Sequence, residues 1–168
     1  VEGQTVAVKR DVLPTPSDPQ NKLGTRSQLF MGPVDLHDYT IEADVQPTQK
    51  NGDLPDYGLI NSGYTMTIRS SNGKLRLYSW SPHDYRTYAE VNYNAKPGTW
   101  YRMKLRVEQS GETANVAGKI WPRDQQEPEQ WSVEMVDQRP VTSGSPGIFG
   151  KSDSAEFYVD NVTVVPNG

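Results

Sequence analysis

Two predicted strands, residues 64–69 and 74–80, carry side chains that could recognise a ligand. Side chains of a strand point alternately to its two faces, so the apolar residues of this hairpin share one face. The other face then presents Arg69, Arg76, Tyr78 and Trp80. Aromatic rings stack on the C–H face of a sugar ring, and guanidinium groups bind hydroxyls or carboxylates. We therefore predict a ligand-binding face, for which the alternative is an ordinary solvated sheet face.

Two neighbouring segments extend this predicted face. In the strand 100–107 apolar residues alternate with basic ones, and we include Arg102 among the ligand-binding residues. The loop that follows the hairpin supplies His83 and Tyr85, because loops at strand ends commonly hold ligands. His83 beside Asp84 could act as a base with its orienting carboxylate, although a plain turn explains the same pair.

Catalysis is an alternative that the acidic residues leave open. Hydrolysis of a glycosidic bond needs two carboxyl groups. Glu42 and Asp44 are the best candidates, because positions i and i+2 of a strand point to the same side. A solvated strand face accounts for the same two residues, so we assign no catalytic residue and keep Glu42 and Asp44 as the alternative.

Short segments in which apolar and polar residues alternate dominate the chain, and turn residues separate them. The predicted strands cover residues 28–31, 39–45, 57–60, 64–69, 74–80, 88–93, 100–107, 114–121, 131–135 and 156–164. Many short strands joined by turns indicate an all-β, two-sheet antiparallel β-sandwich or jelly roll. The 168 residues fit a single domain, with an irregular N-terminal segment, 1–27, and a core, 28–165.

Composition narrows the class of partner. The chain has 17 basic and 21 acidic residues, a net charge of −4 and no basic block, so nucleic acid is not an expected partner. No apolar run approaches the roughly 18 residues of a membrane helix. The chain has no cysteine, which excludes disulfides and a thiol nucleophile. The chain begins with Val1 rather than methionine, and its last residues, VVPNG (164–168), are typical of a linker. We therefore expect an excised part of a larger secreted protein.

Several sequence blocks resemble the concanavalin A-like lectin/glucanase sandwich, including its laminin-G-like branch. The blocks are LFMG (29–32) with DYTIEADV (38–45), YGLINSGY (57–64), GTWYRMKLRV (98–107), the loop GKIWPRDQQEPEQW (118–131), and GSPGIFG (144–150) with FYVDNVTV (157–164). They are similar to domains of secreted bacterial proteins. Among these are C-terminal domains of quinoprotein-type β-propellers and domains described as 3-keto-glycoside hydrolases.

The resemblance implies a concave sheet that binds glycans. It also implies a structural Ca²⁺ ion, with Asp160 at the position where many relatives bind the metal. Related endo-glucanases carry a further acidic residue after the Glu-x-Asp pair, whereas this chain has Gln46 and then Pro47. That difference argues against a retaining hydrolase.

We therefore predict a non-catalytic carbohydrate-binding module that binds a polysaccharide or oligosaccharide on its concave face. We expect it to be secreted, periplasmic or on the cell surface, beside other domains of its parent chain. The alternatives are a glycoside hydrolase and a structural or docking domain. Two carboxyl groups about 5–10 Å apart across a groove would favour the enzyme, and a flat apolar patch would favour docking. The basic residues of the face favour an acidic polysaccharide.

Overall fold

The computed structural model describes residues 5–10, 26–79 and 88–168, and these residues form twelve strands and one 3-10 turn. The strands are β1 (Ala7–Lys9), β2 (Arg26–Phe30), β3 (Tyr39–Pro47), β4 (Asp56–Asn61), β5 (Tyr64–Arg69), β6 (Lys74–Ser79), β7 (Tyr88–Asn92), β8 (Tyr101–Ser110), β9 (Thr113–Pro122), β10 (Val133–Asp137), β11 (Gly147–Lys151) and β12 (Phe157–Pro166). The described residues include no helix long and apolar enough to cross a lipid bilayer.

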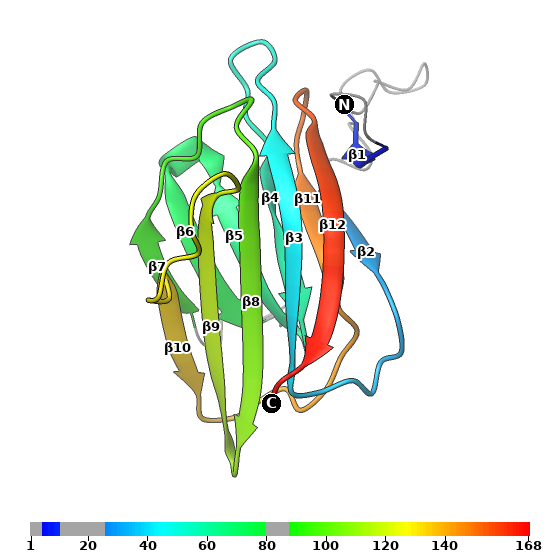
Figure 1. Ribbon diagram of the computed structural model, residues 1–168, viewed down its shortest axis with the longest axis vertical. Coiled ribbons are helices and arrows are strands. Elements are labelled where there is room, and N and C mark those ends of the chain that lie inside the picture. The colour runs from blue at the N-terminus through cyan, green and yellow to red at the C-terminus, as the bar shows by residue number, and fades with distance from the viewer. Residues whose placement is uncertain (1–4, 11–25, 80–87) are drawn as a thin grey trace.

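The strands form two six-stranded sheets that pack face to face (Figure 1). Each sheet is named here after its two edge strands. The β1–β10 sheet has the order β1-β12-β3-β8-β9-β10, and the β2–β7 sheet has the order β2-β11-β4-β5-β6-β7. All neighbouring strands in both sheets run antiparallel. The all-β, two-sheet antiparallel sandwich predicted from the sequence is therefore confirmed.

The core lies between the two sheets. Ile41 and Leu105 from one sheet and Leu59, Met66 and Leu77 from the other are fully buried. Burial of such side chains stabilises the fold by about 25 cal/mol for each Å² of apolar surface. Because alternate side chains point away from this core, each sheet also presents an outer face. The two outer faces point in opposite directions, so they are separate candidate surfaces.

Two strands differ from the prediction. β1 forms inside the segment 1–27, for which the sequence predicts irregular structure. β11 has no alternating pattern, because glycine occupies positions 147 and 150. Packing explains both glycines: a Cβ at Gly147 would lie 2.8 Å from the carbonyl oxygen of Leu29, and a Cβ at Gly150 would lie 2.4 Å from the Phe157 ring.

The turn between β5 and β6 also differs in detail. The Asn72-Gly73 pair predicts a hairpin turn in which both residues have positive φ. The chain instead forms a 3-10 turn over Ser70–Asn72, and Gly73 has a φ of 62°. Among these residues, then, Gly73 takes the left-handed conformation that favours glycine.

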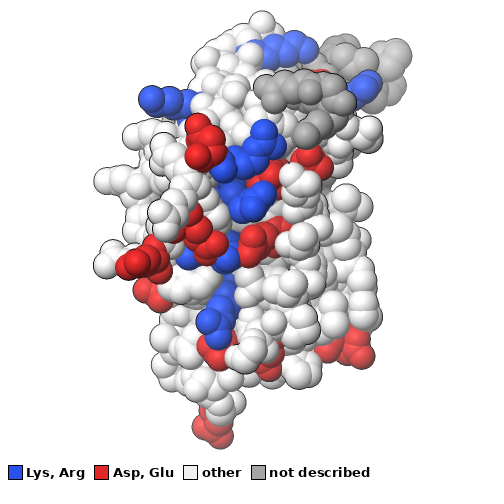
Figure 2. Space-filling view, viewed as in Figure 1, with Lys and Arg blue, Asp and Glu red and all other residues white. Residues whose placement is uncertain are grey.

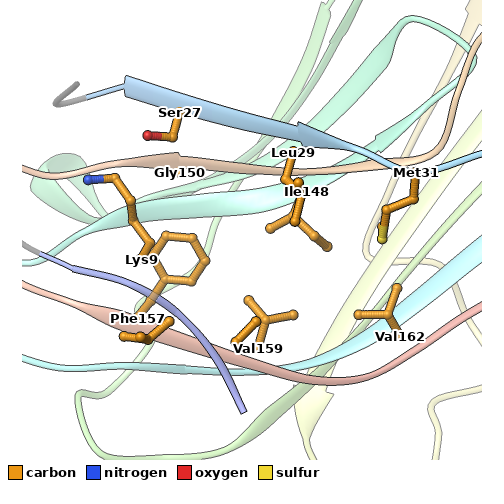
Figure 3. A pocket seen from close by; sticks show the side chains of 11 residues that line it. Lys9, Ser27, Leu29, Met31, Ile148, Gly150, Phe157, Val159 and Val162 are labelled. Atoms are coloured by element: carbon orange, nitrogen blue, oxygen red, sulfur yellow. The ribbon is translucent and has the colours of Figure 1, made fainter.

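Among the described residues, the two sides of the sandwich differ in how closely the sheets approach. β10 lies against β6 and β7, which closes one side, whereas a pocket of about 250 Å³ separates the sheets along the opposite side (Figure 3). Its lining is almost wholly apolar and includes Leu29, Ile148, Phe157 and Val159. The long apolar strands of the two sheets thus do not meet completely at the β1 and β2 edges.

Candidate functional site

The outer face of the β2–β7 sheet brings together three of the predicted ligand-binding residues. Arg69 at the end of β5 and Arg76 and Tyr78 on β6 line one small pocket of about 80 Å³. Asp56, Thr67 and three residues of β2 and β11 complete its lining. The predicted residues Trp80, His83 and Tyr85 lie outside the described residues.

Arg76 is held in place by a cross-strand partner. Its Nε and Nη2 atoms both donate to Oε2 of Glu90, at 2.8 and 2.6 Å. The guanidinium also lies over the ring of Tyr88, 5.6 Å from the ring centre. Such contacts fix the orientation of a guanidinium that would otherwise move freely. The site therefore includes an ordered cation and an ordered carboxylate side by side.

Tyr88 is the aromatic residue that sequence reasoning missed. It pairs with Tyr78 across β6 and β7, and 61% of its surface is exposed. An exposed ring beside paired hydrogen-bonding groups can stack on the apolar face of a sugar. The signal was available, because Tyr88 and Glu90 alternate with Ala89 and Val91 on β7.

Two threonine hydroxyl groups lie buried on this same outer face. Thr65 and Thr67 are 0% and 3% exposed, and neither Oγ1 atom has a hydrogen-bond partner among the described residues. Thr67 lines the pocket. A buried polar group without a partner is uncommon in folded proteins and marks a place where a ligand or water can bind. The pocket is thus bordered by a buried hydroxyl as well as by cations.

Asp56 is the carboxylate in the lining of this pocket. Burial raises the pKa of Asp56, although the N–H of Ser70 and the charges of Arg69 and Lys151 oppose that rise. The N–H of Ser70 donates to its Oδ1 atom at 2.8 Å. Asp56 is therefore anchored to the turn after β5.

Arg102 does not join the other predicted residues, because β8 belongs to the β1–β10 sheet. Its Nε and Nη2 atoms donate to Oδ1 and Oδ2 of Asp44 at 2.7 and 3.0 Å. Asn161 also donates to Asp44 at 2.8 Å. Arg102 is thus bound to a neighbouring strand on the opposite outer face.

Asp44, one of the two alternative catalytic residues, is fully buried beneath these donors. Burial alone raises the pKa of Asp44, but the hydrogen bonds from Arg102 and Asn161 and the charges of Arg102 and Arg123 outweigh it, so the pKa is lowered. A general acid needs the opposite shift, because it must hold a proton near neutral pH. Asp44 has the environment of a structural ion pair.

Glu42, the other alternative, borders a groove of about 300 Å³ on the β1–β10 sheet. Its Oε1 lies 2.8 Å from Nζ of Lys104, and Oε1 of Glu127 lies 2.7 Å from the same nitrogen. These two carboxylates therefore lie close enough for a hydrolase pair. Burial raises the pKa of Glu127, but hydrogen bonds from Lys104 and Lys119 reverse the effect and lower it. The lowered pKa of Glu127 is the opposite of what a general acid needs, and both carboxylates are occupied by the ammonium of Lys104.

Basic side chains form a line along the middle of this face, with acidic ones beside them (Figure 2). Lys119 shows how tightly they are held: Nζ lies 2.7 Å from both Glu127 Oε1 and the carbonyl oxygen of Pro128. The same ammonium lies 5.8 Å from the ring centre of Trp121 and 4.7 Å from that of Trp131. These contacts hold the Pro-rich loop on the sheet. Trp121 and Trp131 therefore have a structural role, which is to hold this loop through Lys119.

Asp160 lies on β12 in register with Asp44 on β3. Its Oδ1 accepts a hydrogen bond from the N–H of Asn161 at 2.8 Å. Calcium takes six to eight oxygen ligands, and within the described ranges no three His, Asp or Glu residues form a metal-binding group. Asp44 is already occupied by its own donors. The described residues do not by themselves fit calcium, and a calcium site stays a prediction.

The sequence matches no family model and no curated protein. Its fold is similar to that of the carbohydrate-binding module CBM66 from Bacillus subtilis, with a TM-score of 0.59, 14% identity, and coverage of 83% of this chain and 81% of that one. Sheep galectin-11 gives a TM-score of 0.51 at 9% identity, covering 83% of this chain and 95% of the galectin. Galectin LEC-6 from Caenorhabditis elegans gives a TM-score of 0.50 at 10% identity, covering 82% of this chain and 95% of the galectin. These similarities establish a jelly-roll fold.

Proposed function

We propose that this chain is a non-catalytic carbohydrate-binding module that binds its glycan on the outer face of the β2–β7 sheet. Tyr88 is the stacking platform, and the Arg76–Glu90 pair binds ring hydroxyls. Arg69, Tyr78 and Thr67 line the adjoining pocket. This face takes the role of the concave face that the sequence resemblance implies.

The observation that carries the proposal is the exposed Tyr88 ring beside the ordered Arg76–Glu90 pair. Sugar sites combine an aromatic surface with a few fixed polar groups, because sugars have both apolar C–H faces and many hydroxyls. The similar solved folds carry the names of a carbohydrate-binding module and of galectins, which is consistent with this reading. A closer relationship to laminin-G-like or 3-keto-glycoside hydrolase domains stays a prediction, as does export from the cell.

The hydrolase alternative has weaker support. Its two predicted carboxylates, Glu42 and Asp44, are both ion-paired with basic residues of β8. The groove beside Glu42 nevertheless contains Trp131 and Arg106, and the Nε of Arg106 is buried without a partner among the described residues. The experiment must therefore show which of the two outer faces binds the glycan.

A glycan array probed with the purified chain and three variants tests the proposal. We expect Tyr88→Ala and Arg76→Gln each to weaken glycan binding by about fivefold to tenfold, since one such contact contributes about 1 kcal/mol or slightly more. Arg106→Gln on the opposite face is the matched control and should bind like the unaltered chain. Circular dichroism and thermal melting confirm that each variant is folded.

Three outcomes would contradict the proposal. Loss of binding in Arg106→Gln, with normal binding in Tyr88→Ala, would move the site to the groove of the β1–β10 sheet. Release of reducing ends from any bound glycan would establish an enzyme. Absence of binding across the whole array would favour the structural or docking alternative.

A further inference from the structure

The pocket beside Arg69 is surrounded by positive charge. Arg26 on β2 pairs in register with Lys151 on β11, and Lys151 pairs with Asp56 on β4. Arg69 at the end of β5 lines the same pocket. Three cations thus surround one carboxylate, and Arg76, a fourth cation of the lining, is neutralised by Glu90. The local excess of positive charge is notable because the whole chain has a net charge of −4.

These cations differ in their pairing from those on the opposite sheet. Within the described part of the chain, no ion pair involves Arg26, Arg69 or Lys151. On the β1–β10 sheet, by contrast, Arg102 and Lys104 are each bound to a carboxylate of β3. Neighbouring cations repel one another, and Asp56 supplies one negative charge among these three. The pocket lining therefore keeps an excess of positive charge, which an anionic group of a ligand offsets.

We propose that the glycan inserts an anionic group, a carboxylate or a sulfate ester, into this pocket, so that the ligand is an acidic sugar. This inference rests on the proposed function and names the ligand class for the same site. Arg69 binds such a group through paired N–H donors, because a guanidinium matches the geometry of two acceptor oxygens. Lys151 and Arg26 add charge at the rim.

The size of the pocket and the properties of Asp56 are consistent with an anionic group of the glycan in this pocket. The pocket, at about 80 Å³, is much smaller than the groove of about 300 Å³ on the other sheet, so it accepts a compact substituent and leaves the sugar ring outside. Asp56 opposes an anion, but burial raises the pKa of Asp56. Protonation of Asp56 removes the repulsion and adds a donor, so binding of an acidic sugar should strengthen as the pH falls towards the acid range.

Matched pairs of polysaccharides provide the test. The probes are polygalacturonate with its methyl-esterified form, and chondroitin sulfate with its desulfated form. Isothermal titration calorimetry at low and at physiological salt measures each affinity. We expect at least one acidic member to bind about tenfold more tightly than its modified partner, because a charge-assisted bond is about twice as strong as a neutral one. The first pair reports a carboxylate and the second a sulfate.

Variants then locate the charge. Arg69→Gln and Lys151→Gln should each weaken binding of the acidic probe by about tenfold, and should weaken binding of the modified probe by much less. Arg139→Gln is the control, since it removes one exposed positive charge elsewhere. Equal loss in Arg139→Gln would overturn the inference, because the attraction would then come from overall charge.

The two proposals fail in different ways. Equal affinity for acidic and modified probes would overturn the anionic pocket and leave glycan binding intact. Absence of binding to every probe here and to every glycan of the array would overturn both proposals. A preference for the acidic form that Arg69→Gln and Lys151→Gln leave unchanged would also overturn the assignment to this pocket.

Discussion

Replacement of Asp44 by asparagine should destabilise the sandwich far more than a similar change in an exposed ion pair. Asp44 is 0% exposed and accepts hydrogen bonds from Arg102 and Asn161. Removing one partner of a buried pair costs about 3–5 kcal/mol. The side chain of Arg102 is 39% exposed, so water stabilises it after the change. We therefore expect a loss of about 2–3 kcal/mol, since each hydrogen bond to a charged group contributes about 1.5–3 kcal/mol.

Urea denaturation followed by tryptophan fluorescence measures this loss, and calorimetry should show a fall in Tm of about 4–12 °C for a domain of this size. Glu108→Gln is the control, because the pair of Arg106 and Glu108 is exposed on the same sheet face and such pairs contribute about 0–1 kcal/mol. Equal losses in the two variants would refute the assignment of Asp44 as a structural residue.

The pH dependence gives a second check on Asp44. Its pKa is lowered in the folded chain from an ordinary value of 3.8, so the folded state favours the ionised form. The stabilisation from this group is therefore fully present above pH 3.8 and is lost as the pH falls through the lower, folded pKa. The free energies of unfolding of the unaltered chain and Asp44→Asn should converge below that pH. A constant difference down to strongly acidic pH would contradict the argument.

Two further predictions concern packing on either side of the molecule. Lys119→Met removes the ammonium that binds Glu127 and the two indole rings. We expect the free energy of unfolding to fall by about 1–3 kcal/mol and hydrogen exchange in the loop after β9 to accelerate. Unchanged exchange would show that the loop does not depend on this contact. Gly150→Ala places a Cβ 2.4 Å from the ring of Phe157 and should cost about 1–3 kcal/mol in denaturation experiments, with unchanged stability as the contrary result.

Alternation along single strands explains what the sequence could predict. The hairpin of β5 and β6 places Arg69, Arg76 and Tyr78 on one face, because successive side chains of a strand point to opposite faces of the sheet. The same rule places Arg102 outward but does not say from which sheet, since that depends on long-range strand order. A one-dimensional pattern also cannot show that Glu127, in the loop after β9, returns to bind Lys104. These contacts depend on tertiary structure.

The two outer faces also have different freedom to vary. On the β1–β10 sheet, ion pairs join neighbouring strands and the loop after β9, so a substitution there disturbs several partners and its effect is not additive. On the β2–β7 sheet, Arg26, Lys151 and Tyr88 are exposed, and surface substitutions of this kind usually change stability by less than about 0.5 kcal/mol. The ligand preference that we propose for the β2–β7 face can therefore diverge during evolution, or be redesigned, while the other face preserves the fold.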